Sequence, residues 1–153
     1  MFFTYNATTY QGKEKQMKNK ATFKTAEPYQ QDATNLPVED LEKAIPFYET
    51  IMGFQMTSRQ DSPHKSAVLS RDQIQIGLAE NGSDPTQDGC FFEVDDVEAA
   101  FMELKTNGLD NEEVGYRVDK YGDTSFRVFF VVAPDGLSYC LGQRLWLLLV
   151  FDR

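Results

Sequence analysis

The chain has 153 residues, 25% of them charged and 13% aromatic, and its formal net charge is −9. Twelve Phe and seven Tyr can form the core of one compact domain, which excludes disorder as a description of the whole chain. The negative charge argues against a nucleic-acid partner, because phosphate contacts need clustered Lys and Arg. No apolar run approaches the roughly 20 residues that span a bilayer, so we expect no membrane partner either.

The first residues differ from the rest in charge. Residues 1–25 contain five Lys and one Glu, a net charge of +4, whereas the remainder contains 10 basic and 23 acidic residues, a net charge of −13. Residues 1–27 are predicted to form a basic N-terminal arm that is mobile or loosely attached. We expect a cytoplasmic protein, because the N-terminus turns polar at Thr4 and two cysteines cannot form a disulfide framework.

A sequence pattern returns after 56 residues. Residues 36–45 (LPVEDLEKAI) align with residues 92–101 (FEVDDVEAAF), and each copy is typical of a strand end followed by an amphipathic helix. Asp40 and Asp96 are the expected N-caps of these helices. The first helix should bend or restart at Pro46, and each helix should end at or before a glycine.

Three strands are predicted after each helix. They cover residues 54–59, 65–70 and 73–79 in the first copy, and 113–119, 125–132 and 137–143 in the second. We therefore predict an α+β fold of two tandem βαβββ modules. Module one covers 28–80, a linker rich in turn formers covers 81–88, and module two covers 89–144. The apolar C-terminal extension, 145–153, is expected to pair as an extra strand or to pack against the core or a second chain.

This order of elements and three sequence segments resemble the glyoxalase, bleomycin-resistance and extradiol-dioxygenase superfamily, whose fold is called vicinal oxygen chelate. The segments are residues 36–48 with Gly53-Phe54, residues 92–97, and residues 133–136 (APDG). Together they cover about residues 28–144. The resemblance implies that the modules form a curled mixed sheet around a cavity, and that the chain forms a homodimer.

The resemblance also identifies the positions at which metal-dependent members place their ligands. In this sequence they fall on Ala33, Gly77, Gly89 and Cys140. The first three cannot coordinate a metal, and a single Cys is not a site, because divalent metals need about three or more protein ligands. We therefore expect no metal, no cofactor and no catalytic residue of the family's kind.

Three of the predicted ligand-binding residues follow from strand patterns in module two. Alternation along a strand places Phe91 and Glu93 on the same face as Gly89. Glu93 then offers a carboxylate beside an aromatic wall, or else points to solvent or caps the next helix. Phe129 belongs to residues 126–131, which are apolar on nearly both faces, and one face is expected to line a ligand cavity.

The other four predicted ligand-binding residues follow from the family register. Asn35, Gln75 and Ser138 each lie two residues from a metal position, so they share its face of the strand. Cys140 occupies such a position itself, and is either a small core residue or a cavity residue. A nucleophilic role for it would need a nearby base.

Two functions from different classes fit these observations. The first is a metal-independent small-molecule binding protein resembling bleomycin-resistance proteins, which sequesters a cationic aromatic ligand in a dimer cavity. The alternative is a metal-dependent lyase, isomerase or oxygenase of the glyoxalase or dioxygenase kind, with atypical ligands such as Asp32, His64 and Glu93. A third hypothesis is a stress or mobile-element protein whose cavity has no present ligand.

Overall fold

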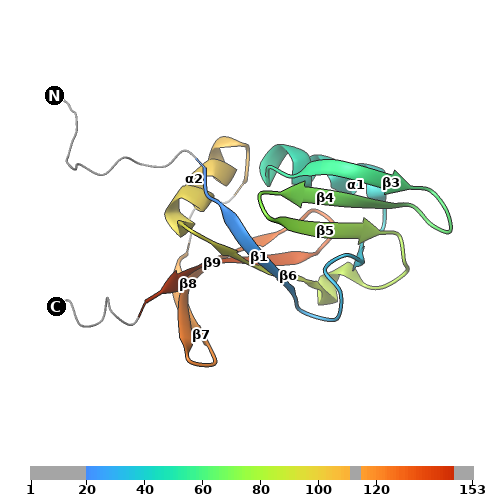
Figure 1. Cartoon of the computed structure of the whole chain (residues 1–153). Helices are drawn as coiled ribbons and strands as arrows, with labels where there is room; N and C mark the ends of the chain where they lie inside the picture. Colours follow the sequence, from blue (N-terminus) through green and yellow to red (C-terminus); the bar gives the residue numbers. More distant parts are fainter. Residues whose placement is uncertain (1–19, 111–114, 147–153) are drawn as a thin grey trace, which may run out of the picture.

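Two β-sheets built in the same way make up the protein (Figure 1). The computed structural model describes residues 20–110 and 115–146. Module one contains β2 (Leu36–Pro37), α1 (Leu41–Pro46), β3 (Gln55–Gln60), β4 (Ser66–Arg71) and β5 (Ile74–Ala79). Module two contains β6 (Gly89–Val94), α2 (Val97–Thr106), β7 (Arg117–Tyr121), β8 (Thr124–Val132) and β9 (Ser138–Leu145). The linker between them includes a short 3₁₀ turn, Pro85–Gln87.

The strand order is the same in both modules. It is β2-β5-β4-β3 in module one and β6-β9-β8-β7 in module two. In each module the first strand pairs in parallel with the last, and the remaining neighbours are antiparallel. The predicted α+β fold of two βαβββ modules is therefore confirmed.

Both helices begin and end where the sequence predicts. The side chains of Asp40 and Asp96 accept hydrogen bonds from backbone N–H groups in the first turns, as N-caps do. Helix α1 gives way at Pro46 to a π-helical turn, Phe47–Ile51, because the proline ring lacks the N–H of a continuous ladder. The chain then turns at Gly53, whose φ of +77° favours glycine.

The end of the predicted N-terminal arm is instead a strand. Residues Phe23–Pro28 form β1, which adds antiparallel to β6 at the edge of the module-two sheet. Phe23 is fully buried, and its ring lies 5.4 Å from that of Phe92. The prediction of a loosely attached arm is wrong for residues 23–27, because the buried side chain of Phe23 and the pairing of β1 with β6 hold these residues in place. The rest of the arm, residues 1–19, lies outside the described residues.

The start of β1 is held by a buried ion pair that joins the two modules. Arg71, at the end of β4, lies 2.8 Å from a carboxylate oxygen of Glu103 on α2. Its guanidinium also donates to the carbonyl oxygens of Met52 and Ala21, at 2.6 and 2.8 Å. Ala21 in turn donates its N–H to Glu103 at 3.2 Å. One arginine therefore connects module one, module two and the chain just before β1.

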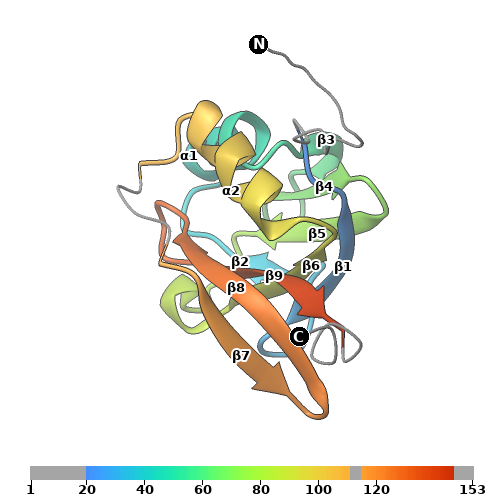
Figure 2. The same cartoon turned by 90° about the vertical axis from the view of Figure 1, so that its left-hand side faces the viewer.

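One hydrophobic core lies beneath the helices and is shared by both modules. Figure 2 shows α1 and α2 together on one side of the molecule, with β7, β8 and β9 on the other. Across the core, the hydroxyl groups of Tyr48 and Tyr139 are 2.6 Å apart, one from each module. Among the described residues, none of the helices has the length and apolar character needed to cross a membrane.

Only the start of the predicted C-terminal extension lies within the described residues. Leu145 is the last residue of β9, so it continues the strand beyond the predicted end at residue 143. Trp146 follows and is 60% exposed. The apolar run after it, residues 147–153, lies outside the described part of the chain.

Candidate functional site

The two faces of the module-two sheet have different surroundings. Phe92 on β6 and Tyr139 on β9 pack into the core beneath the helices. The alternate residues point the other way, because successive side chains of a strand point to opposite faces. Phe91 pairs with Cys140 across β6 and β9, so their side chains lie together on the face away from the helices.

A cavity of about 500 Å³ opens on this second face. Such a volume suits a small organic ligand. The strand β1 and the residue after it supply one wall, β6 the floor, and β7, β8 and β9 the remainder. The residues that line the cavity are Thr25, Glu27, Pro28, Tyr29, Phe91, Glu93, Tyr121, Thr124, Phe126 and Arg144.

Three aromatic rings form a cluster in the cavity. The ring of Phe91 lies 5.0 Å from that of Phe126 and 5.5 Å from that of Tyr121, and the last two are 5.8 Å apart. Tyr29 also lines the cavity and is 43% exposed. Partial burial is the main cause that raises the pKa of the Tyr29 hydroxyl above its ordinary value. Tyr121 is 49% exposed and Phe91 is partly exposed, so a flat guest can stack on these rings or pack against their edges.

Gly142 on β9 allows Phe91 to lie where it does. A Cβ added at Gly142 would meet two carbons of the Phe91 ring at 2.7 and 2.9 Å, closer than side chains approach one another. Any larger residue there would therefore force the Phe91 ring to shift from this position. The sequence offers no periodic signal for this glycine, because its role is to leave space for a ring on the neighbouring strand.

Charged groups in the cavity are arranged as one ion pair and one separate carboxylate. Arg144 donates to both carboxylate oxygens of Glu93, at 3.1 and 3.0 Å, which is the bidentate geometry of strong pairs. Glu27 pairs with Phe91 in the β1–β6 register and is exposed. Within residues 20–110 and 115–146, the Glu27 carboxylate has no hydrogen bond or ion pair. Two carboxylates and one guanidinium give the cavity a net charge of −1.

The predicted ligand-binding residues of module two separate into two groups. Phe91 and Glu93 line the cavity. Cys140 lies on the same face but beneath it, buried against Phe126, and burial raises its thiol pKa to about 11. Ser138 is half-buried at the start of β9, next to Gly89 in register.

The placement of Phe129 in the cavity is wrong. Its side chain is fully buried on the helix side of β8, where its ring lies 5.4 Å from Phe101 and 6.1 Å from Tyr116. The strand is apolar on nearly both faces, so sequence pattern alone could not fix the register. Phe126 occupies the cavity face instead.

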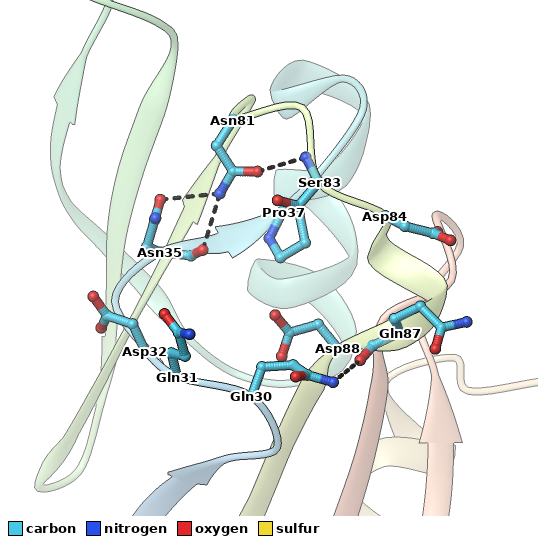
Figure 3. A pocket seen from close by; sticks show the side chains of 10 residues that line it. All are labelled: Gln30, Gln31, Asp32, Asn35, Pro37, Asn81, Ser83, Asp84, Gln87 and Asp88. Carbon is cyan, nitrogen blue, oxygen red and sulfur yellow. Dashed lines mark hydrogen bonds between the residues drawn. The ribbon is translucent and has the colours of Figure 1, made fainter.

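The two predicted residues of module one lie elsewhere. Gln75 is exposed on β5, and Asn35 lines a second pocket of about 400 Å³. This pocket lies between the loop after β1 and the linker before β6, and Figure 3 shows that its walls are almost entirely polar. Asn81 donates to the backbone and side-chain oxygens of Asn35, both at 3.0 Å, and Gln30 donates to the carbonyl oxygen of Gln87 at 2.9 Å. Two pairs of polar residues therefore join the two loops, and none of the described residues that line this pocket is aromatic, so the aromatic cavity is the better candidate site.

The residues at the family's metal positions do not fit a metal. A Cβ at Gly77 would collide with the backbone of Thr34 in the turn before β2, and one at Gly89 with the backbone of Ser138 on β9. Neighbouring backbone therefore fills the space that a ligand side chain would need. Ala33 has no donor atom, which leaves only the Cys140 thiol.

The alternative metal ligands are not brought together either. Asp32 is exposed and accepts hydrogen bonds from Thr34, while His64 is exposed in the loop between β3 and β4. Glu93 is held by Arg144. Over the described parts of the chain, no group of three or more His, Cys, Asp or Glu could hold a metal ion.

Comparisons with known proteins agree with this architecture. A sequence model described as the Glyoxalase/Bleomycin resistance protein/Dioxygenase superfamily matches residues 30–138. No curated protein matches the sequence.

Three solved structures illustrate the fold. A virulence protein from Salmonella typhimurium is 19% identical with a TM-score of 0.59, covering 76% of this chain and 97% of its own. A bleomycin resistance determinant encoded on the transposon Tn5 is 24% identical with a TM-score of 0.55, covering 76% and 99%. The antibiotic binding protein TnmS3 from Streptomyces sp. CB03234 is 23% identical with a TM-score of 0.51, covering 76% and 97%. At identities of 19–24%, the similarity shows that these proteins share the fold and nothing more.

Proposed function

This chain belongs to the glyoxalase/bleomycin resistance protein/dioxygenase superfamily, and on that premise we propose that it binds and sequesters a small aromatic cation without using a metal ion. The observation that carries the proposal is the cavity of about 500 Å³, which is lined by aromatic rings and by the carboxylate of Glu27, a side chain that has no counter-ion among the described residues. Two of the compared structures support a binding role: one is named as an antibiotic binding protein and the other as a bleomycin resistance determinant.

The aromatic lining supports a flat guest. The rings of Phe91, Tyr121 and Phe126 lie within 5.0 to 5.8 Å of one another, and Tyr29 is a fourth aromatic residue that lines the cavity. Each stacking or edge contact with a guest ring contributes about 0.5–1.5 kcal/mol beyond area burial. A ring that also carries positive charge gains further attraction from the faces of the aromatic side chains.

The charges in the cavity support a cation rather than an anion. Glu93 is neutralised by Arg144, whereas Glu27 lies on the exposed wall with its carboxylate free to accept. A guest with a positive charge near its ring can reach Glu27 while the ring stacks on the floor. The acidic body, with a net charge of −13 outside residues 1–25, favours the approach of cations at low salt.

The groups beside the cavity support retention of the guest rather than its conversion. The Cys140 thiol is protonated at neutral pH because burial raises its pKa, so it is a poor nucleophile. The single histidine, His64, is exposed in a loop of module one. Capture of one ligand molecule per cavity is therefore the proposed mechanism.

We propose that a second copy of the chain closes the open side of the cavity. Phe130 and Val132 continue the cavity face of β8 beyond Phe126 and are 39% and 63% exposed. Exposed apolar side chains beside a binding cavity are typical of protein interfaces. The resulting homodimer would act in the cytoplasm. Sedimentation equilibrium tests this, with a dimer expected and a monomer at micromolar concentration contradicting it.

Titration with fluorescent probes of different charge tests the proposed ligand class. Ethidium is a flat aromatic cation, and 1-anilinonaphthalene-8-sulfonate is an aromatic anion. We expect ethidium to bind with one site per chain, and Glu27→Gln to weaken it about tenfold, because a hydrogen-bonded charge contact is lost. The matched control is Glu49→Gln, since Glu49 is exposed on the turn after α1 and away from the cavity residues.

Three outcomes would contradict the proposal. They are no ethidium binding at all, tighter binding of the anion than of ethidium, or equal effects of the two Gln substitutions. Elemental analysis of protein purified without chelator tests metal independence, and one divalent ion bound per chain would contradict it.

A further inference from the structure

The cavity already contains a cation that belongs to the chain. The Arg144 guanidinium binds both oxygens of Glu93 and lies 5.3 Å from the centre of the Phe126 ring and 5.5 Å from that of Trp146. A carboxylate partner and aromatic faces are the contacts that an aromatic-lined site gives to a bound planar cation. Arg144 thus occupies one cation subsite of the cavity.

We propose that Arg144 determines the charge selectivity of the cavity. By holding Glu93 it leaves Glu27 as the one carboxylate open to a guest among the described residues that line the cavity. The site therefore accepts aromatic molecules with one positive charge and discriminates against those with two. This inference rests on the proposed function, because it concerns the same cavity.

The burial of Glu93 explains why a guest does not simply replace Arg144. The Glu93 side chain is 9% exposed, whereas that of Arg144 is 35% exposed. A carboxylate buried to this degree needs a partner, and the tethered guanidinium provides two charge-assisted hydrogen bonds without loss of translational freedom. A free cation would have to break both bonds before it gained its own. Glu93 is therefore a structural counter-ion of Arg144 rather than a ligand contact.

Removing Arg144 should convert the cavity into a site for dications. In Arg144→Met the Glu93 carboxylate is left without its partner and opens toward the guest, so the net charge of the lining changes from −1 to −2. Ethidium and propidium share the same ring system, but propidium carries a second positive charge. We expect the ratio of propidium to ethidium affinity to rise about tenfold in Arg144→Met.

Two controls separate charge from space. Arg144→Lys keeps the positive charge and should leave the affinity ratio near that of the parent protein. Arg144→Met combined with Glu93→Gln creates the same space without the carboxylate, so the ratio should return to the parent value. The double variant also avoids an unpaired buried carboxylate, so it is expected to fold even where the single variant does not.

Glu93→Gln alone gives a second test in a protein that keeps Arg144. Release of the guanidinium should strengthen binding of 1-anilinonaphthalene-8-sulfonate about tenfold, because Arg144 then pairs with the sulfonate. An unchanged propidium ratio in a folded Arg144→Met variant, or unchanged anion binding in Glu93→Gln, would overturn the selectivity proposal. If ethidium does not bind the parent protein at all, the proposed function itself fails, which is a different result.

Discussion

Replacing Arg71 by methionine should be among the most damaging single substitutions in this chain. The side chains of Arg71 and Glu103 are 3% and 7% exposed, so both charges are removed from water. Methionine would leave the Glu103 carboxylate buried without its partner and the carbonyl oxygens of Met52 and Ala21 without their guanidinium donor. Loss of one partner of a buried ion pair costs about 3–5 kcal/mol, and we expect Arg71→Met to lower the free energy of unfolding by that amount.

Urea denaturation followed by far-ultraviolet circular dichroism measures this effect. Arg71→Met combined with Glu103→Leu should recover much of the loss, because no unpaired charge remains. The matched control is Arg59→Met, since Arg59 pairs with Glu42 at the surface and its removal should change the midpoint little. A cost below about 1 kcal/mol for Arg71→Met, or equal costs for Arg71→Met and Arg59→Met, would refute the argument that this pair anchors the start of β1.

Three further predictions concern backbone space and buried titratable groups. Gly89→Ala should destabilise the protein by about 3 kcal/mol, because its φ is +149° and the new Cβ meets the neighbouring strand, whereas Gly82→Ala, with open space around it, should cost only backbone strain. Chemical denaturation of the two variants measures this difference, and an equal loss of stability in both would contradict the collision between the new Cβ at position 89 and the backbone of β9. The Cys140 thiol should react about 100-fold more slowly than an ordinary thiol with Ellman's reagent at pH 8, because burial raises its pKa from 9.0 to about 11. Reaction at the ordinary rate would contradict this burial. Because the thiol pKa is higher in the folded than in the unfolded protein, the stabilisation by the neutral thiol is present below pH 9 and is lost as the pH rises toward 11. Asp135→Asn should raise the unfolding midpoint more at pH 8 than at pH 4. Burial raises the pKa of the Asp135 carboxyl, so its ionisation at the higher pH favours the unfolded state, and an equal shift of the midpoint at the two pH values would contradict this prediction.

Most of the fold could be predicted because the sequence repeats its local signals. Asp40 and Asp96 mark equivalent helix starts 56 residues apart, and each has an acidic side chain that can accept from the first turn. Pro46 indicates the irregular end of the first helix for the same local reason. Caps, helix breaks and strand alternation depend on neighbours in sequence, so they can be read without knowledge of the tertiary contacts.

The strand β1 could not be predicted for the opposite reason. Its sequence, FKTAEP, contains the exposed residues Lys24 and Glu27 and lacks a clear alternation. Its order comes from pairing with β6 and from Arg71 and Glu103, which are distant in sequence. The prediction of a basic arm followed from composition alone. Composition gives no information about the buried Arg71–Glu103 ion pair, which lies on other elements of the fold.

The cavity was only partly predictable from the strands. Alternation along β6 correctly places Phe91 and Glu93 on one face, because polar, small and apolar residues distinguish its two sides. Along β8 both faces are apolar, so the pattern could not distinguish Phe126 from Phe129. Glu27, Tyr29 and Arg144 come from segments whose packing depends on strand order, and no spacing rule in the sequence connects them.

A crystal structure of the protein grown with ethidium tests the central claim most directly. The account predicts the phenanthridinium ring in the cavity of the module-two sheet, in contact with Phe91 and Tyr121, with its charge near Glu27 and the pair of Glu93 and Arg144 intact. Ethidium bound instead in the polar pocket between the two loops, or a cavity that stays free of ethidium at saturating concentration, would contradict it.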